Sequence, residues 1–215
     1  MRVVKLGGSL NRDPLLKDWL QLLASSGAGR VVIVPGGGGF ADQVREHQAQ
    51  WRFDDLAAHN MAILAMMQSA ILMQSLVPAL EMASTPADIH RVLQEGKVAI
   101  WSPIEWLRRQ AGDMTHWGAT SDSLAAWLAG RLGASGLVLV KSGRIQPGLG
   151  VAQQARQGVL DEEFCRVCEG AAYSIDVLGK TALPRMRMLL SLPQADGSCQ
   201  SQGGAPPLKP GGAPP

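Results

Sequence analysis

Two glycine-rich turns, each directly after a short apolar run, constrain most strongly what this chain can fold into. Gly7-Gly8 follows the apolar run 2–6, and Gly36-Gly37-Gly38-Gly39 follows the run 30–34. Near-continuous apolar runs of this length are typical of strands that are covered on both faces of a parallel sheet. Glycine lets the backbone turn sharply and approach a ligand closely, and an open α/β sheet binds ligands at the carboxyl ends of its strands. The sequence therefore predicts an α/β domain with a binding site at this edge.

Short β-branched runs alternate with longer amphipathic stretches along most of the chain. This alternation predicts an α/β fold with a mostly parallel central sheet. The expected strands cover residues 2–6, 30–34, 97–101, 136–141 and 173–177. The expected helices cover residues 14–25, 40–50, 54–80, 86–94, 103–110, 121–132 and 162–170.

The last part of the chain differs in composition from the rest. From about residue 194 it is rich in glycine and proline, and such a segment cannot build a core. The 215 residues suit a single domain. We therefore expect one folded domain over residues 1–193 and a disordered, Pro/Gly-rich C-terminal tail over residues 194–215.

Charge and hydropathy exclude several classes of partner. The net charge of +2, with scattered lysines and arginines, argues against nucleic acid and anionic membranes. Polar residues and Pro78 interrupt the apolar stretch 61–80, which favours a buried helix at a subunit interface over a membrane span. We therefore expect a homo-oligomer. Three cysteines make no disulfide framework and the N-terminus has no signal peptide, so we expect a cytoplasmic protein.

Two lysines and one aspartate accompany the glycine turns. Lys5 and Lys141 each end an expected strand just before a turn that contains glycine. Lysines there can neutralise the charge of a transferring phosphoryl group, and Asp122 can hold both by charge-assisted hydrogen bonds. A simpler interpretation stays open: the glycines form tight turns, the lysines are structural, and Asp122 stabilises the first turn of a helix capped by Thr120 or Ser121.

The second turn also fits a dinucleotide-binding fingerprint. Gly36, Gly38 and Ala41 match the pattern Gly-x-Gly-x-x-Gly/Ala, and Asp54 and Asp55 follow about 20 residues later. An NAD(P)-dependent dehydrogenase is therefore a competing hypothesis, but it leaves the first turn and its lysine unexplained. The chain contains no Walker-type phosphate-binding motif.

Four segments occur in the order seen in one known family. They are Lys5-Leu6-Gly7-Gly8-Ser9, Pro35-Gly36-Gly37-Gly38, Thr120-Ser121-Asp122-Ser123 and Val140-Lys141-Ser142. Over about residues 1–190 the chain thereby resembles the amino acid kinase superfamily, which includes uridylate, aspartate, acetylglutamate and carbamate kinases. The resemblance implies a three-layer α/β/α sandwich and an ATP-dependent small-molecule kinase.

The resemblance also implies roles for individual residues. The ATP phosphates would be bound by Lys5, Gly7, Gly8, Ser9, Lys141 and Ser142. Lys5 and Lys141 would also be catalytic, with Asp122 as their organiser. The acceptor would be bound by Gly36, Gly37, Gly38, Gly39, Thr120 and Ser121. Apart from the resemblance, Asp54 or Asp55 could pair with a cationic amine on the acceptor. We expect ATP and Mg²⁺ as cofactors, the metal arriving with the nucleotide because no carboxylate cluster would hold it alone.

Within the superfamily, several details resemble one group of kinases. They are the compact length, the run Asp55-x-x-Ala58-His59-x-Met61-Ala62-Ile63 and a tryptophan shortly before Thr120, and the group is the aminomethylfuran-methyl phosphate kinases of methanofuran biosynthesis with their methylotroph counterparts. The acceptor implied is (aminomethyl)furanylmethyl phosphate. After Ser142 the chain reads Gly143-Arg144-Ile145-Gln146 where the family usually has Asp-Gly-Val/Ile-Tyr. A catalytically silent nucleotide-binding or storage protein on the same fold therefore remains an alternative.

Overall fold

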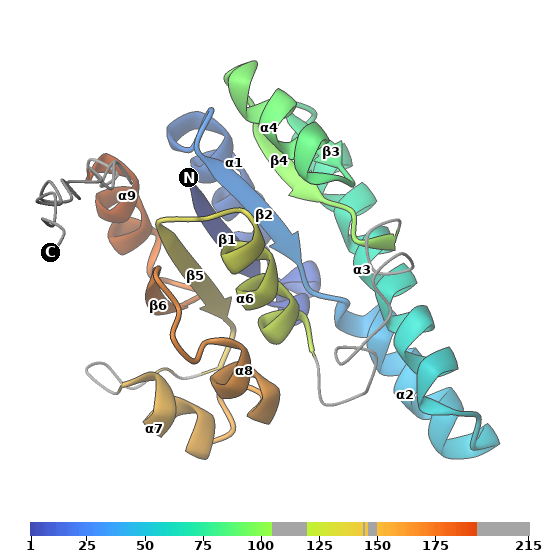
Figure 1. Cartoon of the computed structure of the whole chain (residues 1–215). Coiled ribbons are helices and arrows are strands. Elements are labelled where there is room, and N and C mark those ends of the chain that lie inside the picture. Colours follow the sequence, from blue (N-terminus) through green and yellow to red (C-terminus); the bar gives the residue numbers. More distant parts are fainter. Residues whose placement is uncertain (105–119, 144, 146–149, 193–215) are drawn as a thin grey trace, which may run out of the picture.

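The computed structural model describes residues 1–104, 120–143, 145 and 150–192, and its centre is a sheet of six strands (Figure 1). The strands are β1 (Arg2–Leu6), β2 (Val31–Pro35), β3 (Leu80–Ala83), β4 (Val98–Trp101), β5 (Gly136–Lys141) and β6 (Ser174–Gly179). Their order in the sheet is β3-β4-β2-β1-β5-β6. Each neighbouring pair runs parallel, which confirms the predicted α/β class with a mostly parallel sheet.

Helices cover both faces of this sheet and complete the predicted three layers (Figure 1). One face carries α1 (Leu15–Ser26) and α9 (Leu183–Ser191). The other carries α4 (Pro86–Gln94), α6 (Ser121–Arg131) and α8 (Glu162–Val167), with α7 (Val151–Arg156) packed on α8. Alternate residues of β1 point into the two cores, since Val3 packs with the α6 side and Val4 with the α1 side.

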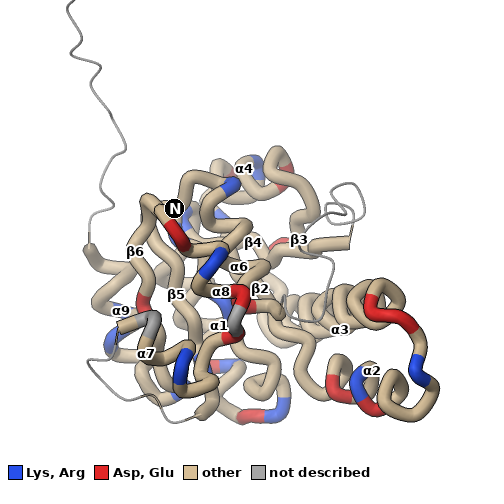
Figure 2. The backbone as a smooth tube through the Cα atoms, turned by 60° about the horizontal axis from the view of Figure 1, so that its bottom comes forward, with Lys and Arg blue, Asp and Glu red and all other residues tan. Residues whose placement is uncertain are grey.

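Two antiparallel helices extend beyond the sheet as a hairpin (Figures 1 and 2). They are α2 (Gly38–Trp51) and α3 (Asp55–Leu76), and Asp54 caps α3 by accepting a hydrogen bond from the N–H of Ala57 at 2.8 Å. The chain has no Lys, Arg, Asp or Glu between Asp55 and Glu81, so α3 is uncharged beyond its first turn (Figure 2).

The apolar character of α3 follows from its packing. By length and composition α3 is the one helix of the described residues that could cross a membrane. It contributes Ile63 and Met66 to one core of the domain, and Ala70 and Met73 to the other. Because α3 packs into both cores, a membrane is not needed to explain its composition.

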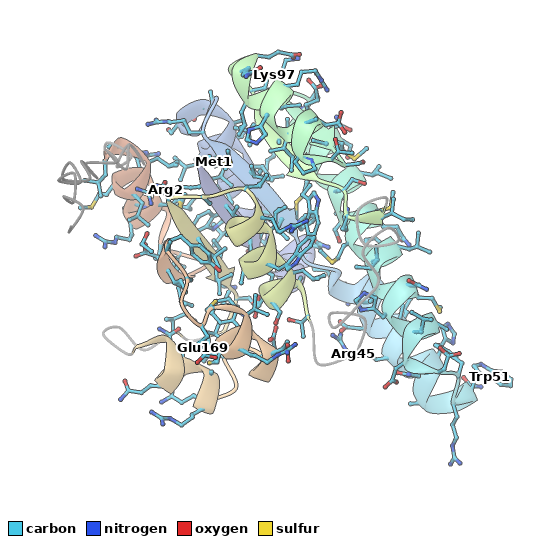
Figure 3. All side chains as sticks on the ribbon, in the orientation of Figure 1. Met1, Arg2, Arg45, Trp51, Lys97 and Glu169 are labelled. Atoms are coloured by element: carbon cyan, nitrogen blue, oxygen red, sulfur yellow. The ribbon has the colours of Figure 1, made fainter. Side chains whose placement is uncertain are left out.

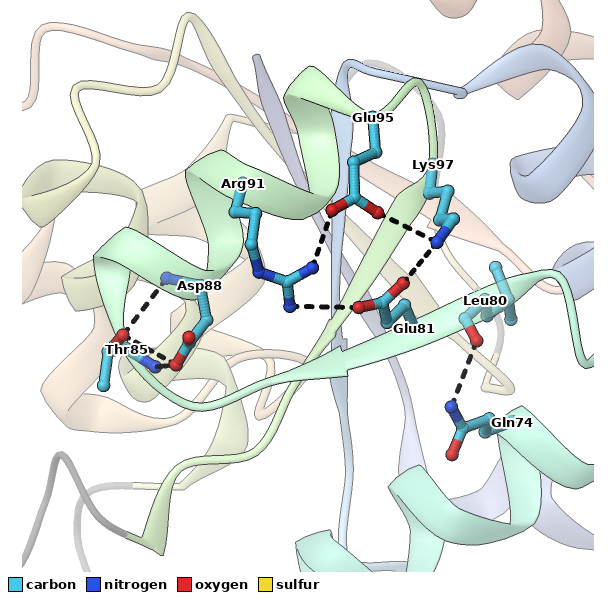
Figure 4. Close-up of polar contacts among 8 residues, drawn as sticks. All are labelled: Gln74, Leu80, Glu81, Thr85, Asp88, Arg91, Glu95 and Lys97. Atoms are coloured by element: carbon cyan, nitrogen blue, oxygen red, sulfur yellow. Dashed lines mark hydrogen bonds and ion pairs between the residues drawn. The ribbon is translucent and has the colours of Figure 1, made fainter.

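The end of α3 differs from the prediction. We expected a helix through residue 80, but α3 ends at Leu76, and Leu80–Ala83 forms β3. Pro78 lacks the backbone N–H that a further helical turn would use. Across this bend the side-chain amide of Gln74 donates to the carbonyl of Leu80 at 3.2 Å (Figure 4).

Charged side chains cover β3, which is an edge strand. Arg91 and Lys97 each donate to the carboxylates of Glu81 and Glu95, over distances between 2.7 and 3.0 Å (Figure 4). Hydrogen bonds from Lys97 and Arg91 hold the pKa of both glutamates below the usual range. Charges on an edge strand discourage pairing with a second sheet.

The remaining elements agree with the prediction to different degrees. The other five strands were predicted, and β1 and β5 have the predicted bounds. The prediction lacked α7, α9 and the 3-10 helix η1 (Gly8–Arg12), and α8 is shorter than the expected helix 162–170. Most of the expected helix 103–110 and the tail 194–215 lie outside the described residues. The domain boundary at residue 193 stays a prediction.

Candidate functional site

The strands β1 and β5 are parallel neighbours, but the chain leaves them toward opposite sides of the sheet. From β1 the chain passes to β2 on one side, and from β5 it passes to β6 on the other. Such a divergence opens a crevice at the carboxyl ends of the two strands, where α/β proteins bind ligands. Lys5 lies near the carboxyl end of β1, and Lys141 is the last residue of β5.

A buried ion cluster joins the ends of these two strands to the start of α6. The Nζ atom of Lys5 lies 2.6 Å from Oδ1 of Asp122, and Nζ of Lys141 donates to Oδ2 of the same carboxylate. The side chains of Lys5 and Asp122 are 6% and 3% exposed, and that of Lys141 is 18% exposed. The fold therefore brings together the three charged residues that the sequence analysis selected.

The electrostatics of the cluster follow from burial and from its excess of positive charge. Burial alone would raise the pKa of Asp122, but the charges of Lys5 and Lys141 and their hydrogen bonds outweigh it and hold this pKa below its usual value. Burial lowers the pKa of Lys141, and the charge of Lys5 lowers it further, against the opposing effect of Asp122 and Asp161. Asp122 is therefore ionised at neutral pH, and Lys141 loses its proton more readily than an ordinary lysine.

The position of Asp122 depends on how α6 begins. Thr120 is the N-cap of α6, and its hydroxyl accepts a hydrogen bond from the N–H of Asp122 at 3.2 Å. An aspartate in the first turn is also favoured by the helix dipole. The predicted capping residue and the predicted first-turn carboxylate are thus parts of one local structure.

Asp161 also contacts this turn, and the sequence analysis missed it. Its carboxylate accepts hydrogen bonds from the hydroxyls of Thr120 and Ser123. It also caps α8 by accepting from the N–H of Phe164 at 2.7 Å. The available signal was an aspartate directly before the expected helix 162–170, which is the N-cap position. Its contact with α6 has no local signal in the sequence.

The two glycine turns lie against each other. A Cβ atom added to Gly8 would lie 2.1 Å from the backbone nitrogen of Gly38, and one added to Gly36 would lie 2.3 Å from the nitrogen of Gly8. Gly38 also has a φ of 57°, in the left-handed region that side chains disfavour. Close backbone approach therefore explains three of these glycines, besides any ligand that they bind.

A first pocket lies over the ends of β1 and β5. Its volume is about 310 Å³. It is lined by Lys5, Gly7, Gly8, Ser9, Lys141, Ser142, Gly143, Ile145, Gly158 and Val159. All six residues that the family resemblance assigns to the ATP phosphates are among them. The hydroxyls of Ser9 and Ser142 lie 2.5 Å apart and connect the two strand ends.

The second pocket lies between α2, α3 and α6 and measures about 60 Å³. It is lined by Gly37, Ala41, Arg45, His59, Ala62, Ile63, Met66, Thr120, Ser121 and Leu124. Gly37 and Thr120 are the N-caps of α2 and α6, so the N-termini of both helices border the pocket. Helix N-termini favour anions. Arg45 of α2, which the sequence analysis missed, adds a cationic side chain (Figure 3).

Only some of the predicted acceptor-binding residues line the second pocket. Gly37, Thr120 and Ser121 line the second pocket, whereas Gly36, Gly38 and Gly39 belong to the adjoining turn. Asp55 does not line either pocket. It is exposed in the first turn of α3 and accepts a hydrogen bond from the side chain of Gln48 at 2.8 Å.

The described residues offer no preformed cation site. Among them, no group of three or more His, Cys, Asp and Glu side chains is arranged to hold a metal ion. The expectation that Mg²⁺ arrives with a nucleotide stays a prediction.

Comparison with known proteins decides the family. The model of the amino acid kinase family matches residues 1–143. The chain belongs to the amino acid kinase family. The matched region contains both glycine turns and the whole Lys5–Asp122–Lys141 cluster, so the family resemblance inferred from these segments is confirmed. The dehydrogenase hypothesis gains no support, because close packing against Gly8 explains Gly36 and Gly38.

Individual relatives agree with this family. Over 130 residues the chain is 32% identical to (5-(aminomethyl)furan-3-yl)methyl phosphate kinase of Methanocaldococcus jannaschii. The aligned region spans 60% of this chain and 59% of the length of that relative. The uridylate kinase of Archaeoglobus fulgidus superposes with a TM-score of 0.65 at 16% identity, over 88% of this chain and 95% of that one. The UMP kinase of Bacillus anthracis superposes with a TM-score of 0.67 at 14% identity, over 88% of this chain and 91% of that chain. The two structures show that the fold is shared.

Replacing Gly8 with alanine is expected to separate the two glycine turns. The added methyl group would lie 2.1 Å from the nitrogen and 2.5 Å from the Cα of Gly38, and backbone cannot move aside as a side chain can. We expect the free energy of unfolding to fall by about 1–3 kcal/mol, as in other overpacked interiors. Denaturant unfolding measures this change.

Gly130→Ala is the matched control. Gly130 lies within α6, and its nearest neighbour would be 3.9 Å from an added Cβ. Helix propensity predicts a gain of about 0.5–1 kcal/mol for this variant. A Gly8→Ala protein as stable as the parent would show that the two turns do not depend on their contact.

Proposed function

We propose that the chain is an ATP-dependent kinase that phosphorylates a small molecule, specifically (aminomethyl)furanylmethyl phosphate in methanofuran-type cofactor biosynthesis. The observation that carries the proposal is the buried Lys5–Asp122–Lys141 cluster between two pockets. Membership of the amino acid kinase family and the identity to the M. jannaschii enzyme support the reaction and the acceptor. The cysteine count supports a cytoplasmic location, and the described Cys165 and Cys168 are free.

The first pocket suits a nucleoside triphosphate. Its floor holds two lysines, and η1 begins there at Gly8, where the first N–H groups of a helix have no intrahelical acceptor. These donors and charges fit phosphate oxygens. Bound there, Mg-ATP would supply the γ-phosphoryl group and the divalent cation. Gly7, Gly8, Ser9 and Ser142 would hold the phosphates.

The second pocket suits a small acceptor with one anionic end and one apolar part. The N-termini of α2 and α6 and the side chain of Arg45 favour a phosphate group, while Ile63 and Met66 provide apolar surface for a ring. Ser121 lines this pocket and precedes Asp122, whose lysine partners line the first pocket. The acceptor would therefore lie next to the catalytic lysines, and Gly36–Gly39 would form the turn beneath it.

Catalysis of such a transfer requires mainly that the reactants are positioned and that the charge of the transferring group is stabilised. An oxygen of the acceptor phosphate forms a bond to the γ-phosphorus while the bond from that phosphorus to the β,γ-bridging oxygen breaks, and ADP leaves with the electron pair. The acceptor phosphate is already ionised, so no general base has to remove a proton. Lys5 and Lys141 offset the charge on the transferring group, and Asp122 fixes both lysines before the substrates arrive.

The proposed reaction is tested by measuring ADP release from Mg-ATP with a panel of acceptors. The panel contains the aminomethylfuran phosphate, UMP and acidic amino acids. We expect turnover with the furan phosphate alone. Turnover with another acceptor would retain the kinase and reject this substrate. No turnover with any acceptor, in a protein that still binds ATP, would favour the catalytically silent alternative.

Lys5→Ala is expected to remove almost all turnover while the protein stays folded. Asp122 keeps Lys141 as a partner, so the carboxylate does not lose its counter-charge. Loss of one group that stabilises transition-state charge typically lowers kcat by about 10²–10³-fold, which steady-state ADP release would reveal. Lys97→Ala removes an exposed lysine of the β3 network and should leave turnover unchanged. Normal activity in Lys5→Ala would refute this mechanism.

We also propose that the protein forms a homo-oligomer through the exposed side of the α2–α3 hairpin. Leu64 and Ile71 of α3 are 46% and 54% exposed, Leu56 is 52% exposed, and Trp51 at the tip of α2 is 70% exposed (Figure 3). Because α3 carries no charge beyond its first turn, the same face of a second copy would cover these apolar side chains without burying charge from α3. Light scattering should give a multiple of the monomer mass, and Ile71→Glu should reduce it. Met188→Glu, at an exposed position on α9, should not. A parent protein that is already monomeric would exclude the interface.

A further inference from the structure

Asp161 receives more hydrogen bonds than its place before a short helix requires. An N-cap aspartate commonly accepts one or two bonds from the first turn of its own helix, and here the N–H of Phe164 provides one at 2.7 Å. Three further donors belong to α6, across 38 to 41 residues of sequence: the hydroxyls of Thr120 and Ser123, and the N–H of Ser123 at 3.3 Å. Most of the bonding capacity of this carboxylate is therefore used to hold α6.

The bond to Thr120 fixes the direction of a hydroxyl that Asp122 needs. The hydroxyl of Thr120 accepts from the N–H of Asp122 at 3.2 Å and donates its single hydrogen to Asp161. Ser123, directly after Asp122, is fully buried and donates to the other oxygen of Asp161. The residues on both sides of the Ser121–Asp122 pair are thus attached to one carboxylate, which limits how far the first turn of α6 can move.

Asp161 also adds a negative charge that acts on Lys141. The charged groups that influence Lys141 are Lys5 of β1, Asp122 of α6 and Asp161 at the start of α8. Two cations and one carboxylate make direct ion pairs, which leaves one positive charge in excess. Asp161 offsets this excess without an ion pair of its own to either lysine.

We propose that Asp161 is a positioning residue of the phosphoryl-transfer site, which fixes the first turn of α6 and thereby Asp122. Its negative charge also favours the protonated form of Lys141. This inference rests on the proposed kinase function. Asp161 contacts neither reactant in this scheme and acts through Thr120, Ser123 and the lysine–aspartate cluster.

Asp161→Asn tests the proposal with little change to the helix cap. Asparagine caps helices about as well as aspartate, but it lacks the charge, and its amide nitrogen cannot accept a bond from a hydroxyl. We expect kcat to fall by about 10- to 100-fold, because small displacements of catalytic groups lower rates by such factors. The change in KM for ATP should be smaller. In the nucleotide-free protein, the titration midpoint of Lys141 should move to lower pH. Side-chain NMR of ¹⁵N-labelled lysines measures that midpoint, with Lys141→Arg used for assignment.

Asp88→Asn is the matched control. Asp88, in the first turn of α4, also accepts from a threonine hydroxyl, that of Thr85 at 2.7 Å, and from a backbone N–H at 3.1 Å. It should lose a similar amount of stability and keep the parental kcat and Lys141 titration. An Asp161→Asn protein that matches Asp88→Asn in both readouts would show that Asp161 is only a helix cap, and would overturn the proposal.

Ser123→Ala is the second variant and keeps the Asp161–Phe164 cap intact. We expect a several-fold lower kcat with little change in the Lys141 titration, because the charge of Asp161 remains. Parental kcat in Ser123→Ala would contradict the positioning role even if Asp161→Asn does not fold. The Lys141 titration needs no substrate, so a parent protein without kinase activity would refute the proposed function and still leave this measurement interpretable.

Discussion

The ion cluster of Lys5, Asp122 and Lys141 is the interaction on which the rest of the site depends. A buried charge that loses all its partners costs several kcal/mol, so Asp122 is tolerated in the interior only while at least one of the lysines at the ends of β1 and β5 pairs with it. The parallel pairing of these strands, with Lys5 opposite Leu139, brings the two lysines to the same edge of the sheet. The first turn of α6 must then lie between them. One pocket is left on the lysine side of this turn and the other on its N-terminal side.

The contact between the two glycine turns complements this cluster. The cluster fixes β1 relative to β5, and the packing of Gly8 against Gly36 and Gly38 fixes β1 relative to β2 and the start of α2. The backbones of the two turns pack directly against each other, so neither turn can shift relative to the other as it could if a flexible side chain separated them. The N-terminus of α2, at the second pocket, therefore has a defined distance from Lys5 at the first. For a transfer between two bound molecules, such a fixed distance contributes to the rate by holding the reacting atoms close together.

The sequence predicted those features that depend on local pattern or on residue type. Five strands were recognisable as apolar runs, and Lys5, Lys141 and Asp122 stood out because charged residues ended apolar strands or followed a helix cap. The strand β3 was missed because Leu80–Ala83 is short and its first residue continues the apolar stretch that was assigned to the expected helix 54–80. Asp161 was missed as a site residue because its contacts cross 38 to 41 residues of sequence. Asp55 shows the opposite case, since its position near the second turn in the sequence does not bring it to either pocket.

The charge balance of the site links substrate binding to protonation. Burial and the charge of Lys5 lower the pKa of Lys141, and two carboxylates only partly oppose this effect. A polyphosphate in the first pocket would bring several negative charges next to Lys141, which favours its protonated form. By linkage, a site that gains protonation on binding an anion binds that anion less well as the pH rises through the pKa of the free lysine. The excess positive charge is thus unfavourable in the empty site and becomes favourable when an anion binds, which is the behaviour expected of a site built to hold a transferring phosphoryl group.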